Sequence, residues 1–186
     1  LATVVEQRVL EGGAHDASGV FRSQRQLVAV HRIFERVHLP LDDVGEELAD
    51  DRPLMEWLKD HVWPVELKHV SPEFVYDGTL LACAEMLRGG VTFFNDMYFF
   101  PEAAARACLD SGMRAGIGLI AVEFPSAYAS DADDYLAKGL ALRDRLGAEE
   151  RLSFCIAPHA PYTVADRTFE RIAILAEELD LPVHIH

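Results

Sequence analysis

Residues 89–122 read GGVTFFNDMYFFPEAAARACLDSGMRAGIGLIAV, and this stretch decides the fold because a helix-like run separates two strand-like runs. Val91–Phe94 is short, apolar and rich in β-branched and aromatic residues, which is typical of a strand. A helix is expected to begin at Pro101 and to end at Gly112, and Met113–Val122 is the next strand. Both strand runs are continuously apolar, so we expect a parallel sheet that helices cover.

The same helix–strand order continues on both sides of this stretch. Helix starts are signalled by Ser71 with Pro72, by Ser130 with Asp133 and by Thr163 with Asp166. Two more strands are expected at 152–157 and 183–186. Four helix–strand pairs predict an α/β fold with a parallel sheet, and an open doubly wound sheet and a (β/α) barrel both agree with this order. No G-x-G-x-x-G follows a strand, and there is no G-x-x-x-x-G-K-[ST].

Composition narrows the possible partners. The chain has 186 residues, of which 50% are hydrophobic, and its 17 Lys and Arg against 31 Asp and Glu give a net charge of -14. This charge opposes binding to phosphate backbones or anionic lipid, so no nucleic acid and no membrane is expected as a partner. Without a long apolar run or a basic, apolar leader, the protein is expected to be cytoplasmic. We expect the cysteines in the core: Cys83, Cys108 and Cys155.

Polar residues at the carboxyl ends of the expected strands are the candidates for a site, because parallel α/β folds place their sites there. These residues are Asn95, Asp96, Glu123, His159, His184 and His186. His184 and His186 share one face of a strand and suit a divalent transition metal, or they are polar residues at an exposed strand end. His159 lies between two prolines, which suits either a preorganised contact or a turn histidine.

The segment MEWLKDHVWPVE, residues 55–66, contains large aromatic side chains before the first clear helix. Trp57 and Trp63 at such spacing are typical of core residues more often than of ligand contacts. Glu66 has no obvious partner nearby in the sequence, so it is either a solvated loop carboxylate or a substrate anchor.

Four blocks together carry a resemblance to a known family: LADDRPLMEWLKDHVWPVE, SPEFVYDGTLLACAEMLRGGVTFFNDMYFFPE, APHAPYTV and LPVHIH. Over residues 48–186 they resemble the 5-methylthioadenosine/S-adenosylhomocysteine deaminases of the amidohydrolase superfamily, a group that includes triazine hydrolases such as N-ethylammeline chlorohydrolase. The resemblance implies a partial (β/α)8 TIM-type barrel, roughly its first half, of the metal-dependent hydrolase type. Residues 1–47, which contain five arginines and no lysine, are expected to form a divergent N-terminal segment.

The resemblance also implies a reaction and roles for particular residues. One divalent metal, usually zinc, would activate a water that attacks C6 of the adenine ring of a small nucleoside and expels ammonia. His186 matches the metal-binding histidine of the fifth barrel strand, whereas His184 matches a variable position. His159 matches a purine contact, and Trp57 and Glu66 match residues of the nucleoside pocket, with Glu66 accepting hydrogen bonds from ribose hydroxyls.

The chain departs from the family pattern in two places. The family begins its barrel with an H-x-H pair, and the corresponding stretch here, HRIFERVHLPLDDVGEE, offers only Arg36 and His38. The expected catalytic Glu and Asp and a later metal-binding His would lie beyond residue 186. We therefore expect an incomplete fragment that is inactive or very weakly active. A homo-oligomer is also expected. The alternatives are a hydrolase for triazines or other aminated heterocycles, and a non-enzymatic α/β remnant that pairs with a partner chain.

Overall fold

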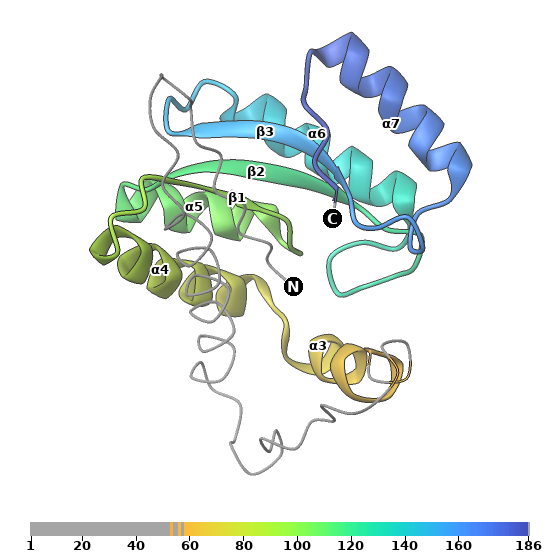
Figure 1. Cartoon of the computed structure of the whole chain (residues 1–186), viewed down its shortest axis with the longest axis horizontal. Helices are drawn as coiled ribbons and strands as arrows, with labels where there is room; N and C mark the ends of the chain where they lie inside the picture. The colour runs from red at the N-terminus through yellow and green to blue at the C-terminus, as the bar shows by residue number, and fades with distance from the viewer. Residues whose placement is uncertain (1–52, 54–55, 57, 186) are drawn as a thin grey trace, which may run out of the picture.

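The computed structural model describes residues 53, 56 and 58–185 of the chain (Figure 1). The expected divergent segment 1–47 and two of the predicted site residues, Trp57 and His186, lie outside the described residues. No helix in the described part of the chain is long and apolar enough to cross a membrane.

Three parallel strands form the sheet, in the order β1 (Phe93–Asp96), β2 (Arg114–Ala121) and β3 (Leu152–Pro158). The register pairs Phe93 with Arg114, and Ala115 with Leu152. Figure 1 shows the three strands side by side, with two helices behind them. The predicted α/β fold with a parallel sheet is therefore confirmed.

Helices connect and precede the strands. A π-helical turn η1 (Leu58–Val62) leads into α3 (Trp63–His69), and α4 (Pro72–Arg88) precedes β1. The later helices are α5 (Pro101–Ser111), α6 (Ala132–Leu146) and α7 (Asp166–Leu179). Both α5 and α6 pack on β2, α4 packs on α5, and α7 contacts β3.

Local capping explains where α4 and α6 begin and where α5 ends. Ser71 Oγ accepts a hydrogen bond from Phe74 N at 3.2 Å, as predicted for the start of α4. Gly112 ends α5 with φ of 75°, a left-handed conformation that glycine adopts without strain. The prediction that Ser130 begins α6 was wrong by one residue, because Asp131 Oδ1 accepts from Asp134 N at 2.9 Å.

Two predicted strand ranges and one helix start need correction. The first strand lies two residues later than predicted, so Asn95 and Asp96 are inside it rather than after it. The expected strand 183–186 is reduced, within the described residues, to a single parallel bridge between Ile156 and Val183. Thr163 does not cap α7, whose N-cap residue Ala165 has no capping side chain of its own.

The core surrounds β2, whose residues are buried from Ala115 to the end of the strand. The three cysteines are buried free thiols, as expected. The main cluster contains Cys83, Met86, Phe94, Ala105, Cys108, Met113, Ala115, Ile117, Leu119, Leu142, Leu152 and Phe154. Glycine is required within β2 because a Cβ on Gly118 would lie 2.5 Å from the backbone oxygen of Asp96.

Gly118→Ala is expected to lower the free energy of unfolding by about 1–3 kcal/mol, because the added methyl group overlaps the β1 backbone. Chemical denaturation measures the change. Gly89→Ala is the matched control, since its Cβ would meet nothing closer than 3.4 Å. Equal denaturation midpoints for Gly118→Ala and the unmodified chain would contradict this description of β2.

Candidate active site

The carboxyl ends of the three strands meet at one edge of the sheet. Asp96 is the last residue of β1, Ala121 the last of β2, and Pro158 the last of β3. The next residue, His159, donates its backbone N–H to the Ala121 oxygen at 3.1 Å, which extends the β2–β3 ladder by one bond. Three of the sequence-predicted residues, Asp96, Glu123 and His159, therefore lie at or just beyond this edge.

Asp96 is a buried carboxyl group, with 4% of its surface exposed. Its Oδ2 has no hydrogen-bond partner within the described part of the chain. Burial raises the pKa of Asp96 from its usual 3.8 to about 6, because the charged form loses its hydration. The Asp96 carboxylate also contributes, after burial, to raising the pKa of the Cys155 thiol to about 11.

Glu66 reaches the same edge from α3. The Tyr98 hydroxyl, two residues past the end of β1, donates to Glu66 Oε1 at 2.9 Å. The ring of Trp63 packs against that of Phe124, which follows β2, with centroids 5.2 Å apart. The pKa of Tyr98 is raised, first by burial and then by the charge of Glu66. Glu66 thus has a partner 32 residues away that sequence reasoning missed, and no local pattern signals it.

His159 is held by a threonine four residues further along the chain. His159 Nδ1 lies 2.9 Å from Thr163 Oγ1, and that hydroxyl donates to the Ala160 carbonyl at 3.1 Å. The spacing of His and Thr in a proline-flanked turn was the signal that could have revealed this pair. The structure therefore has a hydrogen-bonded histidine at the end of β3, which agrees with both a preorganised contact and a turn histidine.

Glu123 caps a helix, whereas its position after β2 had suggested a residue of the site. Its Oε1 accepts hydrogen bonds from Ala165 N at 3.0 Å and from Thr168 Oγ1 at 2.6 Å. Glu123 from the end of β2 thus caps the N-terminus of α7, where a negative charge is favourable. The hydrogen bond from Thr168, followed by that from Ala165, holds the pKa of Glu123 below its usual 4.5.

The predicted metal residues are only partly described. His186 lies outside the described residues, and His184 donates its backbone N–H to the Ile156 oxygen at 2.9 Å, beside the end of β3. Within residues 58–185 no group of three His, Cys, Asp or Glu side chains could hold a metal ion. The pairing of His184 with His186 stays a prediction.

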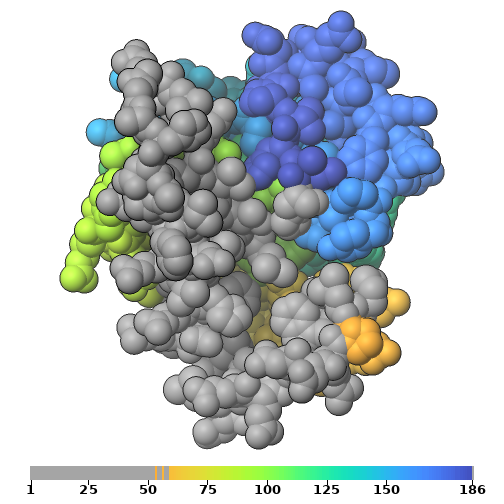
Figure 2. Space-filling view, in the orientation of Figure 1, coloured from red at the N-terminus to blue at the C-terminus, as the bar shows by residue number. Residues whose placement is uncertain are grey.

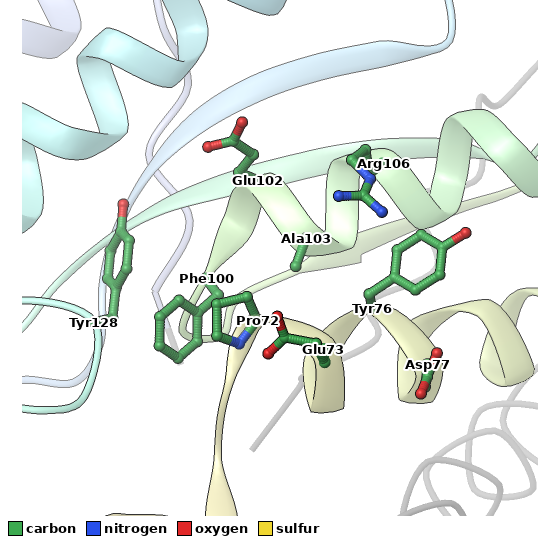
Figure 3. Close-up of a pocket in the computed structure, with 9 residues that line it drawn as sticks. All are labelled: Pro72, Glu73, Tyr76, Asp77, Phe100, Glu102, Ala103, Arg106 and Tyr128. Carbon is green, nitrogen blue, oxygen red and sulfur yellow. The ribbon is translucent and has the colours of Figure 1, made fainter.

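A separate pocket of about 360 Å³ lies between the first turns of α4 and α5 (Figure 3). Arg106 stacks on the Tyr76 ring at 4.7 Å on one side, and Phe100 and Tyr128 lie on the other. None of the sequence-predicted site residues lines this pocket. The carboxyl edge of the sheet is therefore the better candidate for an active site.

The chain belongs to the amidohydrolase family, since a sequence model of that family matches residues 37–186. The resemblance recognised in the four sequence blocks is confirmed. The parallel sheet with its covering helices corresponds to part of the barrel of this family, as predicted.

Individual relatives give a finer comparison. A 5-methylthioadenosine/S-adenosylhomocysteine deaminase of Saccharophagus degradans is 53% identical over 139 residues, 75% of this chain and 31% of that protein. A 5'-deoxyadenosine deaminase of Methanocaldococcus jannaschii is 40% identical over 154 residues, 80% of this chain and 35% of that protein. The crystal structure of a Xanthomonas campestris adenosine deaminase with bound zinc matches with a TM-score of 0.70 and 50% identity, over 75% of this chain and 32% of that one. The chain spans about a third of the length of the relatives it matches.

The buried Asp96 carboxyl makes a testable contribution to stability. In the unfolded chain the Asp96 carboxyl group ionises with its usual pKa of 3.8, whereas in the folded chain its pKa is about 6. Between these two values only the unfolded chain gains the charge, so the free energy of unfolding falls as the pH rises. The stability of Asp96→Asn relative to the unmodified chain should therefore rise by about 2 kcal/mol from pH ~4 to pH ~7. Denaturation of both proteins across this range measures the difference, and a difference independent of pH would contradict the burial of an unpartnered carboxyl group.

Proposed function

We propose that the protein to which this sequence belongs is a metal-dependent hydrolase that deaminates adenine nucleosides modified at the 5' position. The observation that carries this proposal is the 53% identity to a 5-methylthioadenosine/S-adenosylhomocysteine deaminase over 139 residues. The name of the M. jannaschii relative adds 5'-deoxyadenosine to the substrates to be tested.

The proposed pocket lies at the carboxyl edge of the sheet. Glu66 accepts hydrogen bonds from the ribose hydroxyls, and the hydrogen bond from Tyr98 holds its carboxylate in place. His159 contacts the purine ring, and Trp57 lines the nucleoside pocket. A carboxylate and a histidine at one edge favour a nucleoside over a triazine, because a triazine has no ribose hydroxyls for Glu66 to bind.

One divalent metal, zinc in our proposal, is the cofactor, and His186 is the ligand that this chain is proposed to supply. The support is the zinc bound in the X. campestris relative. When bound, such a metal lowers the pKa of a water molecule toward 7 and so supplies a nucleophile at neutral pH. Because the described residues contain no group of three possible ligands, we derive no step through the metal from this structure.

A chimeric enzyme tests the proposed activity at full length. The matched 139 residues of the S. degradans relative are replaced by those of this chain, and ammonia release is measured with methylthioadenosine, S-adenosylhomocysteine and 5'-deoxyadenosine. We expect turnover of at least one nucleoside. A folded chimera that releases no ammonia from any of the three would contradict the proposal.

Within this chimera, Glu66→Gln is expected to raise KM for methylthioadenosine about tenfold, since a hydrogen bond to a charged group is lost. The value of kcat should change less, because the ribose hydroxyls do not react. Glu73→Gln, at an exposed glutamate in the first turn of α4, is the matched control and should leave KM unchanged.

We also propose that the chain forms homo-oligomers. The non-enzymatic alternative to the proposed function is an α/β remnant that pairs with a partner chain. Within the described residues β1 pairs with β2 alone, so its other edge presents backbone groups that a further strand can bind. Size-exclusion chromatography with light scattering at several concentrations should show dimers or larger species. A monomer at every concentration would contradict the proposed homo-oligomer.

A further inference from the structure

The helix that carries Glu66 is too short to be stable by itself. α3 has seven residues and none of them is buried, whereas an isolated helix of fewer than about 12 residues is marginal in water. Within the described residues, the element on which α3 packs closely is η1. Figure 1 shows α3 apart from the helices that cover the sheet, and in Figure 2 the orange and yellow surface of η1 and α3 lies at the lower right of the molecule. The position of α3 therefore depends on individual side-chain contacts.

Tyr98 makes one of these contacts, from the segment that follows β1. Its hydroxyl donates to Glu66 Oε1 at 2.9 Å, and its ring is buried. Burial, followed by the charge of Glu66, raises the pKa of Tyr98, so the hydroxyl keeps the proton that it donates. The Tyr98 ring belongs to the same buried cluster as Val70, the residue that ends α3. Tyr98 therefore holds both the Glu66 carboxylate and the end of the helix that carries it.

Phe124 makes another contact, from the segment that follows β2. The centroid of its ring lies 5.2 Å from that of Trp63, the first residue of α3. Trp63 and Glu66 are three positions apart, so their side chains lie on one face of the helix. Because Trp63 contacts the segment after β2 and Glu66 contacts the segment after β1, this face is turned toward the carboxyl edge of the sheet.

We propose that Tyr98 and Phe124 are positioning residues for Glu66, which hold α3 at the carboxyl edge and fix the Glu66 carboxylate before a ligand binds. The consequence for binding rests on the proposed function, in which Glu66 accepts hydrogen bonds from the ribose hydroxyls. A carboxylate that is already held loses little freedom when the ribose binds, so both contacts favour binding. Because the ribose hydroxyls do not react, the two residues act on KM more than on kcat.

Hydrogen exchange of the α3 amides in the 186-residue chain tests the positioning without any ligand. Tyr98→Phe keeps the ring and removes the hydroxyl, and we expect the amides of residues 67–70 to exchange about tenfold faster, since a hydrogen bond to a charged group is lost. Phe124→Leu should accelerate the same amides, because it removes the ring contact with Trp63. Exchange of the β2 amides should stay unchanged in Tyr98→Phe.

Tyr76→Phe is the matched control, because it removes another tyrosine hydroxyl that donates to a carboxylate. The Tyr76 hydroxyl of α4 donates to Asp110 Oδ2 of α5 at 2.8 Å, and this bond does not involve α3. Tyr76→Phe should therefore leave exchange in α3 unchanged. Equal exchange in α3 for the unmodified chain and Tyr98→Phe, or equal acceleration by Tyr98→Phe and Tyr76→Phe, would overturn the proposal.

The consequence for binding is measured in the chimeric enzyme. Tyr98→Phe should raise KM for methylthioadenosine about tenfold and change kcat less. The analogue of methylthioadenosine that lacks both ribose hydroxyls, used as a competing ligand, should bind equally well with and without the substitution, because it offers Glu66 no hydroxyl. Weaker binding of both nucleosides would make Tyr98 a purely structural residue and overturn its role in positioning Glu66.

The two experiments separate this proposal from the proposed function. An unmodified chimera that releases ammonia, with the same KM in Tyr98→Phe, would overturn the positioning of Glu66 and leave the function in place. If the unmodified chimera releases no ammonia while Tyr98→Phe accelerates exchange in α3, the proposed function fails and the positioning of α3 stands.

Discussion

The parallel hydrogen-bonded ladder on both sides of β2 is the interaction on which the rest of the structure depends. It brings β1 and β3 into register with a strand that is buried from Ala115 onward. Gly118 makes this possible, because its missing side chain leaves space for the β1 backbone. Because the ladder is parallel, the carboxyl ends of the three strands lie at one edge of the sheet, together with the polar residues that follow them.

Contacts between residues far apart in the sequence turn this edge into a candidate site. Tyr98, after β1, holds Glu66 of α3 through one hydrogen bond. Glu123, after β2, caps α7 and holds the segment that carries His159 and Thr163. Of the predicted substrate residues in the described part of the chain, Glu66 is thus held by a residue that follows β1. His159 is held by a residue of its own turn.

The sequence predicted the elements well where the signal was local. The capping serine of α4 and the glycine that ends α5 are where the pattern placed them, because these signals act within one turn of helix. The partner of Glu66 and the capping of α7 by Glu123 could not be predicted, because they join residues 32 and 42 positions apart. The prediction of a strand at 183–186 was wrong for a related reason. Whether a segment forms a strand depends on the strands beside it in the sheet, and the sequence of the segment alone does not show these.

Our central claim is that an adenine nucleoside binds at the carboxyl edge of the sheet. Backbone amide NMR of the chain during titration with methylthioadenosine tests this most directly. Our account predicts saturable shift changes at 96–98, 122–124 and 159–163, with no changes at the start of β2. Shift changes concentrated at the amino ends of the strands, or around the pocket between α4 and α5, would contradict it.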